Sequence, residues 1–475
     1  MYQAIVFISA LIIAATVLIA FRNLRDASLV MLKALTVIYC SIAFVHLLLS
    51  DSFIFVINGG WFYGVKYEAT DYLQMILRWG YYTNYAVLSM AVFCEGRFFK
   101  NFASYISLPF SIVSTVFFDD FMKYFLDPAG LGYKPDEWFR YGFFVLELTL
   151  AIAIPLIMMV RERHIFNVKS LTEWKSFLLG VPAVLLVMMP AFVPQAIMGT
   201  SVITPPMFGE YHLIWVAVSL VLVVALYLFF RFKDYVTRRN LVLFLSLVLF
   251  FHYNTLYMMG VTISRLPFQL CNIAAYFYLI ASVFKLDKMF QFCFVINSVG
   301  TIFAILFPDL SIGASGFWNV HFLYEHTLVL IVGALGMGLR IVPRLETKSI
   351  KYFMLGYTAY FLFVFILGTI LNGYSDVTGE TVNYFYMFDF DIAFDYFPFL
   401  SFTEDYYITM GRFIVYPLVV LILYVGFGVL SFLFYFLVRY LYRLDDDHLE
   451  LRRSSIELYE RITGRRAHRP KEFID

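Results

Sequence analysis

The chain has 475 residues, of which 61% are hydrophobic and 15% are charged. No soluble domain of this length needs so much apolar surface, and runs of eighteen or more apolar residues recur along the sequence. The composition therefore excludes a soluble globular protein and predicts an all-α polytopic membrane protein. The net charge of +1 gives no sign of a nucleic-acid partner, and we expect none.

About thirteen apolar segments are predicted to cross the bilayer. The first, from Tyr2 to Phe21, has no basic residue before it and no small-residue cleavage site, so we expect a retained helix rather than a cleaved signal. The thirteen segments run near 2–21, 30–56, 74–94, 102–118, 138–160, 174–199, 211–230, 240–260, 267–284, 289–307, 320–339, 351–371 and 411–438.

Basic residues gather in every second connection between these segments. They begin with Arg22 and Arg25 and end with the tail after Arg439, whereas the connection from Asn372 to Met410 carries acids and no Lys or Arg. Because cytoplasmic loops carry an excess of basic residues, this alternation predicts an N-terminus outside and a C-terminus in the cytosol.

Three regions follow from this pattern. Residues 1–200 are predicted to form a six-helix transmembrane extension, and residues 208–440 a seven-helix transmembrane core. Residues 441–475 are predicted to form a charged cytosolic tail.

A cysteine and a histidine are predicted to lie at one depth in the membrane. The chain has four cysteines, with no metal-ligand spacing and no disulfide framework. Cys271 lies about four residues, roughly 6 Å, into the segment 267–284, and His326 lies about six residues, roughly 9 Å, into 320–339. Both segments enter from outside, so the two side chains share the level of the outer glycerolipid ester carbonyls. His321 lies nearer the surface and is less favoured.

A thiol at this depth is a candidate nucleophile. It becomes reactive when a base such as imidazole takes its proton, and attack of Cys271 on a lipid ester would give an acyl thioester that a second hydroxyl could collect. We expect no metal and no organic cofactor. Glu325 precedes His326, but adjacent helical residues point apart, so it is given no role. Four polar residues could stabilise the oxyanion or orient His326: Gln269, Asn272, Asn383 and Tyr384.

Other interpretations of these residues stay open. A lone membrane cysteine is usually a packing residue, and a lone histidine near a helix end usually forms an interfacial hydrogen bond. Glu147 with His46 would suit a transporter of lipids or small solutes, because carboxylates at that depth are often functional. A non-catalytic scaffold for envelope machinery, working through the charged tail, is the third possibility.

A set of short motifs follows in order through the second half of the chain. They are His212-Leu213-Ile214-Trp215, Leu266-Pro267-Phe268-Gln269-Leu270-Cys271-Asn272, Phe307-Pro308-Asp309-Leu310, His326, Asn372-Gly373 and Asn383-Tyr384-Phe385-Tyr386-Met387. In this order the motifs resemble the YwaF-like bacterial integral membrane proteins. That family includes the animal transmembrane acyltransferase that remodels ether phospholipids.

The resemblance covers residues 208–440 and implies a helical-bundle acyltransferase that works through Cys271 and His326. It further implies that Gln269 and Asn272 line the cavity, and it places the protein in a bacterial cytoplasmic membrane with phospholipids as partners. A second envelope membrane protein, bound through the N-terminal helices or the tail, is a further expected partner. The six N-terminal helices have no counterpart in the family.

Overall fold

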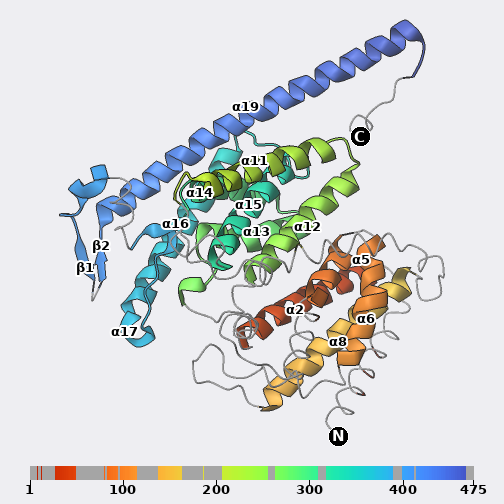
Figure 1. The fold of residues 1–475 in the computed structure, drawn as a ribbon, viewed down its shortest axis with the longest axis horizontal. Helices are drawn as coiled ribbons and strands as arrows, with labels where there is room; N and C mark the ends of the chain where they lie inside the picture. The colour runs from red at the N-terminus through yellow and green to blue at the C-terminus, as the bar shows by residue number, and fades with distance from the viewer. Residues whose placement is uncertain are drawn as a thin grey trace. The chain divides into compact units, whose positions relative to one another are not determined.

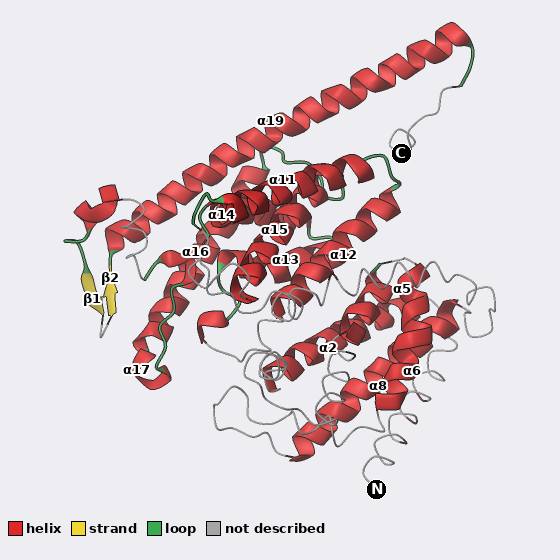
Figure 2. Cartoon of the chain, viewed as in Figure 1, coloured by secondary structure: helices red, strands yellow, loops and turns green. Residues whose placement is uncertain are grey.

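The chain is mostly helical (Figure 2). The computed structural model describes residues 27–49, 83–94, 97–114, 137–162, 206–254, 263–308, 317–388, 398–410 and 413–466, with the single residues 8, 12, 16, 80 and 186. Apart from those single residues, the predicted segments 2–21 and 174–199 lie outside the described residues. The chain divides into two compact units, and the division passes through two of its helices.

The first unit comprises residues 1–205, 243–261 and 309–324. Helices α2 and α6 both pack against α8. A π-helical turn, Ala103–Ser107, joins α5 to α6 without a break. Among its described residues, the helices that lie wholly within this unit are α2 (Ala27–Leu49), Thr83–Phe93, α5 (Arg97–Phe102), α6 (Leu108–Ser114) and α8 (Glu137–Glu162).

The second unit comprises residues 206–242, 262–308 and 325–475. Seven long helices lie between residues 206 and 466 of the described chain, and each coincides with one predicted segment (Figure 1). They are α11 (Glu210–Phe230), α12 (Tyr235–Asn254), α13 (Leu270–Phe284), α14 (Asp287–Leu306), α15 (Phe317–Gly338), α16 (Ser349–Gly373) and α19 (Pro417–Thr463).

The start of the last predicted segment differs from the structure. Residues 413–415 form strand β2 (Phe413–Val415), which pairs antiparallel with β1 (Ile408–Met410). The helix begins only at Pro417, its first residue. Proline is favoured at a first helical position, because its missing N–H would have no partner there.

Helix α14 forms the centre of the second unit. It packs against α13, α16, α19 and α11, and most of its side chains are buried. Aromatic rings fill the contacts: Phe294 packs on Phe434 of α19 at 5.7 Å between ring centres, and Phe277 of α13 packs on Phe292 at 6.5 Å. Burial of this extent is expected for a helix that neighbours surround.

Five helices are long and apolar enough to cross a bilayer, counted over the described residues. They are Tyr141–Glu162, Glu210–Phe230, Asp287–Leu306, Ser349–Gly373 and Pro417–Thr463. The prediction of a helical membrane protein is thereby confirmed. The thirteen crossings and the orientation remain predictions.

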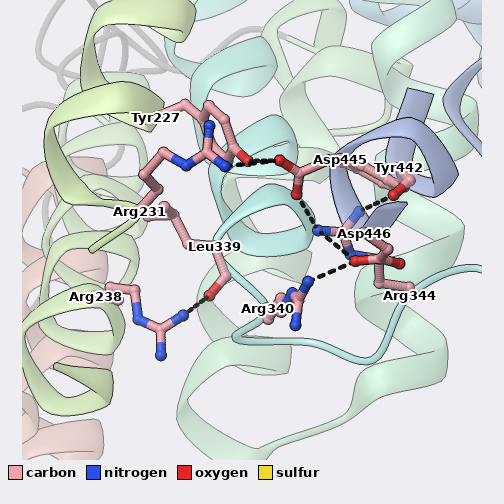
Figure 3. A network of polar contacts seen from close by, with 9 residues as sticks. All are labelled: Tyr227, Arg231, Arg238, Leu339, Arg340, Arg344, Tyr442, Asp445 and Asp446. Carbon is pink, nitrogen blue, oxygen red and sulfur yellow. Dashed lines mark hydrogen bonds and ion pairs between the residues drawn. The ribbon is translucent and has the colours of Figure 1, made fainter. Parts of the chain in front are cut away.

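Charged residues fix the second half of α19 to the bundle (Figure 3). Asp445 accepts hydrogen bonds from Tyr227 at 2.6 Å, from Arg231 at 3.1 Å and from Arg344 at 2.7 Å. Burial raises the pKa of Asp445, but the hydrogen bonds from Tyr227 and Arg344 and the charges of Arg344 and Arg231 outweigh it, so that the pKa lies below its usual value. Asp445 is therefore held as a carboxylate.

Two further contacts extend this cluster. Arg344 donates to the backbone oxygen of Tyr442 at 2.9 Å, and its guanidinium lies 4.4 Å from the centre of the Tyr442 ring. Asp446 pairs with Arg340. A guanidinium can stack with its face while its N–H edge donates, so Arg344 joins the α15–α16 connection to α19 in two ways.

Candidate functional site

The N-terminus of α13 presents the predicted nucleophile. Gln269 caps the helix in an extended conformation, two residues after Pro267, and Cys271 is the second helical residue. Its half-buried thiol donates to Asn272 Oδ1 at 3.1 Å. The backbone N–H groups of Cys271 and Asn272 also approach the sulfur. First-turn N–H groups have no helical partner and favour negative charge, so this helix end offers hydrogen-bond donors to a polar group bound beside the sulfur.

Gln269 ties this helix end to a turn that follows α16. Its side-chain N–H donates to the Asn383 backbone oxygen at 2.9 Å, and its side-chain oxygen accepts from the Phe385 N–H at 2.9 Å. Asn383 Oδ1 accepts from the Phe388 N–H at 3.0 Å, and the Tyr384 hydroxyl donates to the Ile263 backbone oxygen. The side chains of Gln269, Asn383 and Tyr384 thus all form hydrogen bonds to backbone groups, and these bonds hold the turn next to the helix end that carries Cys271.

This turn is strained. Phe385 and Tyr386 both have positive φ, 54° and 55°, a conformation that bulky residues rarely adopt. Packing of the Phe385 ring compensates, at 5.1 Å from Phe427, 5.5 Å from Phe361 and 6.1 Å from Tyr360 between ring centres. Strained backbone persists where surrounding contacts determine it, and such positions cluster at functional sites.

Tyr360 extends the group of rings around Phe385 toward the Cys271 thiol. The hydroxyl of Tyr360 on α16 donates to the Phe268 backbone oxygen at 2.8 Å, and Tyr360 is an electrostatic neighbour of Cys271. The surroundings of Cys271 therefore combine polar N–H groups at the helix end with large apolar rings, a combination typical of small-molecule and lipid sites.

Helices α13 and α15 run in the same direction. The end of α13 meets the start of α14, where Tyr278 lies 4.9 Å from Phe290 between ring centres. Phe290 and Phe294 also fill the space beside Gly336 and Gly333, which lie late in α15. Both α13 and α15 are therefore antiparallel to α14 and parallel to each other.

A close contact sets the register between these two helices. The Tyr278 hydroxyl on α13 occupies the space that a Cβ at Gly333 of α15 would fill. Cys271 precedes Tyr278 by seven residues, and His326 precedes Gly333 by seven. Residues seven apart lie on nearly the same face of a helix, about 10 Å along its axis. The register thus brings Cys271 and His326 to one level along the two helices.

The early part of α15 is polar although it is buried. Glu325, His326 and Thr327 are at most 4% exposed, and Thr327 lies 2.7 Å from the Ser219 hydroxyl of α11. Glu325 is an electrostatic neighbour of Cys271, although sequence reasoning gave it no role. A carboxylate inside an apolar segment is energetically costly and often functional, and this pattern could have identified Glu325 from the sequence.

The other histidine of α15 has a partner in the first unit. His321 and His252 stack with 4.1 Å between ring centres, and each ring N–H donates to the backbone oxygen of the other residue, at 3.1 and 3.2 Å. Reciprocal bonds of this kind hold both rings in a fixed tautomer. His321 is thereby engaged in a structural pair with His252.

Glu147, the carboxylate on which the transporter interpretation rests, also has a structural partner. Glu147 on α8 is fully buried and accepts a hydrogen bond from the Tyr85 hydroxyl, and the Tyr85 ring packs 4.7 Å from that of Tyr39. The side chain of His46 lies outside the described residues. Glu147 is therefore part of the packing between the helices of the first unit.

One comparison with known proteins gave a match. Neither the curated proteins nor the solved structures contain one, and within the described residues no three His, Cys, Asp or Glu side chains could hold a metal ion together. Residues 207–442, which contain α11 to α19 up to the charged cluster, match the TMEM164 family, a family of transmembrane proteins. The chain is a membrane protein whose second half is similar to that family.

Proposed function

We propose that this protein is a membrane-embedded acyltransferase that moves a fatty acyl group between lipids through a thioester on Cys271. The observation that carries the proposal is the register of α13 and α15. It is set by Tyr278 against Gly333 and brings Cys271 and His326 to one level. Cysteine–histidine pairs of this kind perform acyl transfer on unrelated folds.

The reaction has two halves. His326 takes the proton of the Cys271 thiol as the sulfur attacks an ester carbonyl of a phospholipid. The ester C–O bond then breaks, and the leaving lysolipid oxygen takes the proton from His326. In the second half a lipid hydroxyl gives its proton to His326 and attacks the thioester. The acyl group passes to that oxygen, and the thiol is restored.

The local structure supports each half. Backbone N–H groups of Cys271 and Asn272 approach the sulfur, and in the proposed reaction they would stabilise the oxyanion of both tetrahedral intermediates. The packed rings of Tyr360, Phe385 and Phe427 make the surroundings of this helix end apolar, as an acyl chain requires. The reaction needs no metal or organic cofactor.

The proposal also includes the membrane location and topology that the sequence predicts. The chain crosses a bacterial cytoplasmic membrane about thirteen times with its N-terminus outside. The site then opens to the outer leaflet, and membrane phospholipids are both donors and acceptors. Residues 1–200 and the charged tail are the regions available to a further envelope protein.

A thioester assay tests the nucleophile. The purified protein is incubated with phospholipid labelled in its acyl chain, and we expect a protein-bound label that hydroxylamine releases. Cys271→Ala should abolish the adduct, whereas Cys293→Ala, which changes a fully buried cysteine of α14, should retain it. A normal adduct yield in Cys271→Ala would contradict the proposal.

A further inference from the structure

Helix α19 carries leucine at every seventh position for six repeats. The leucines are Leu423, Leu430, Leu437, Leu444, Leu451 and Leu458. The first three lie in the apolar half of the helix, where contact with lipid explains them. The last three lie among charged residues and are 47%, 68% and 58% exposed.

The charged half of α19, residues 439–463, lies outside the membrane. The helix has 47 residues and is therefore about 70 Å long, whereas the hydrocarbon core of a bilayer is about 30 Å thick. The apolar half already fills that thickness before Arg439. Figure 1 shows α19 continuing past the other helices of its unit. Lipid tails therefore cannot cover the exposed leucines of the charged half.

The bundle does not cover these leucines either. Side chains at Val438, Tyr442, Asp445 and Leu449 face the bundle, and all four are buried or half-buried. A one-residue step turns a helix by about 100°. Leu444 directly precedes Asp445, so its side chain points about 100° away from the side chains that face the bundle. Leu451 and Leu458, one and two heptads later, point the same way.

We propose that the charged half of α19 is a dimerisation segment that binds the same segment of a second copy in a parallel two-stranded coiled coil. Leucine at one core position of each heptad is typical of parallel two-stranded coiled coils. The other core position carries Leu441, His448, Ser455 and Ile462, with Leu441 and Ile462 51% and 75% exposed. Two copies in one membrane have the same orientation, so their α19 helices emerge parallel.

The charges beside the leucines fit this arrangement. In a parallel coiled coil, the residue just before a core position of the second set, such as His448, faces the residue five places later on the partner helix. That rule pairs Asp447 of one copy with Arg452 of the other. Within its own chain the Arg452 guanidinium lies 4.5 Å from the centre of the Phe232 ring. Stacking uses the guanidinium face and leaves its N–H edge for a carboxylate.

The two polar core positions make this coiled coil weak on its own. His448 and Ser455 are both exposed, and polar residues at such positions cost stability while they fix register and strand number. The membrane compensates, because two copies held in one bilayer meet at a high effective concentration.

Disulfide trapping in the full-length chain tests the proposal. Leu451→Cys and Leu458→Cys are made separately, reconstituted in liposomes at a low protein-to-lipid ratio and oxidised mildly. Facing core positions come within the Cα separation of about 4.4–6.8 Å that a disulfide needs. We expect both variants to form covalent dimers, and only a parallel, in-register pair can link both.

The matched controls lie on the outer side of the same heptads. Arg453→Cys and Glu460→Cys change side chains that a coiled coil holds apart, so we expect them to cross-link roughly tenfold less or weaker still. The unaltered chain gives the background of the four native cysteines. Equal cross-linking of core and outer positions would overturn the proposal. Failure of the core variants to cross-link, with protection from an aqueous thiol reagent only in anionic liposomes, would show that a lipid surface covers the stripe instead.

A second measurement needs no cysteine. Leu451→Lys with Leu458→Lys should lower the fraction of dimer in liposomes at a fixed protein-to-lipid ratio, measured by energy transfer between donor-labelled and acceptor-labelled copies. The substitutions lie outside the acyl-transfer site, so hydroxylamine-labile adduct and thermal stability should stay unchanged. A folded double variant that remains as dimeric as the unaltered protein would count against the coiled coil.

Discussion

The hydroxyl of Tyr278 fills the space that a side chain at Gly333 would need. Gly333→Val therefore forces α15 away from α13. We expect the free energy of unfolding to fall by about 1–3 kcal/mol, as overpacked cores usually show. Thioester formation should fall further than the folded fraction does, because the level shared by Cys271 and His326 is lost. Thermal unfolding and adduct yield on the same preparation measure the two effects.

The control for this variant is Gly426→Ala in α19. A Cβ at Gly426 meets nothing within 4 Å, and alanine favours a helix over glycine by about 1 kcal/mol. We expect unchanged or slightly higher stability and a normal adduct yield. Full activity of a folded Gly333→Val would show that acyl transfer does not depend on this register.

The two histidines of α15 should behave differently when they are replaced. His326→Ala removes the proposed base, and general-base catalysis is worth about 10²–10⁴-fold in rate. We therefore expect the rate of thioester formation to fall within that range while the protein stays folded. Single-turnover labelling over time gives the rate.

His321→Ala is the matched comparison. It removes the stack and one of the reciprocal hydrogen bonds with His252. We expect lower thermal stability and an unchanged labelling rate per folded molecule. The reverse result, slow chemistry in His321→Ala and normal chemistry in His326→Ala, would exchange the two assignments.

Gln269→Leu removes both hydrogen bonds to the turn at residues 383–387. The Asn383 oxygen and the Phe385 N–H lose a partner, and an orphaned buried group costs about 1–3 kcal/mol. Since Phe385 and Tyr386 hold positive φ, the turn should relax. Amide hydrogen exchange should rise there and stay unchanged in α14.

Gln269→Glu serves as the graded control. A carboxylate keeps the acceptor for the Phe385 N–H and loses the donor to Asn383, so hydrogen exchange in the turn should lie between the two extremes. Identical exchange in all three proteins would show that packing alone holds the turn.

Asp445→Asn should destabilise the protein in a pH-dependent way. Hydrogen bonds to charged groups are worth about 1.5–3 kcal/mol, and Asp445 accepts three of them. Its pKa is lowered in the folded protein. The stabilisation is therefore present above the unfolded value, near 4, and is lost as the pH falls through the lower folded value.

Thermal unfolding at several pH values measures this effect. The difference between the unaltered protein and Asp445→Asn should be largest near neutral pH and shrink in acid. Asp405→Asn changes an exposed carboxylate and should have little effect at any pH. A difference that stays constant from neutral to acid pH would contradict an ionised Asp445.

Apolar periodicity predicted much of the second half of the chain. Runs of apolar residues indicated seven helices between residues 211 and 438, and seven long helices lie there in the described residues. The boundaries were less predictable. The last helix starts at Pro417 because residues 413–415 pair as a strand, and strand pairing depends on contacts that no local pattern contains.

The site was predictable in part. Depth counting indicated that Cys271 and His326 share a level, since rise per residue is fixed. It could not supply the register between α13 and α15, which depends on where Tyr278 meets a glycine. Gln269, Asn383 and Tyr384 were expected to stabilise the oxyanion or to orient His326. Their hydrogen bonds to backbone groups became visible only once the turn after α16 was folded.

Helix α19 offers a mechanical link across the bilayer. Its proline is at the first position, and 47 residues follow one another without interruption. In this one helix Phe427 packs on Phe385, and Asp445 further along is bound by three side chains. A displacement of the charged segment along the helix axis would therefore be transmitted to the Phe427 ring, and through Phe385 to the turn after α16.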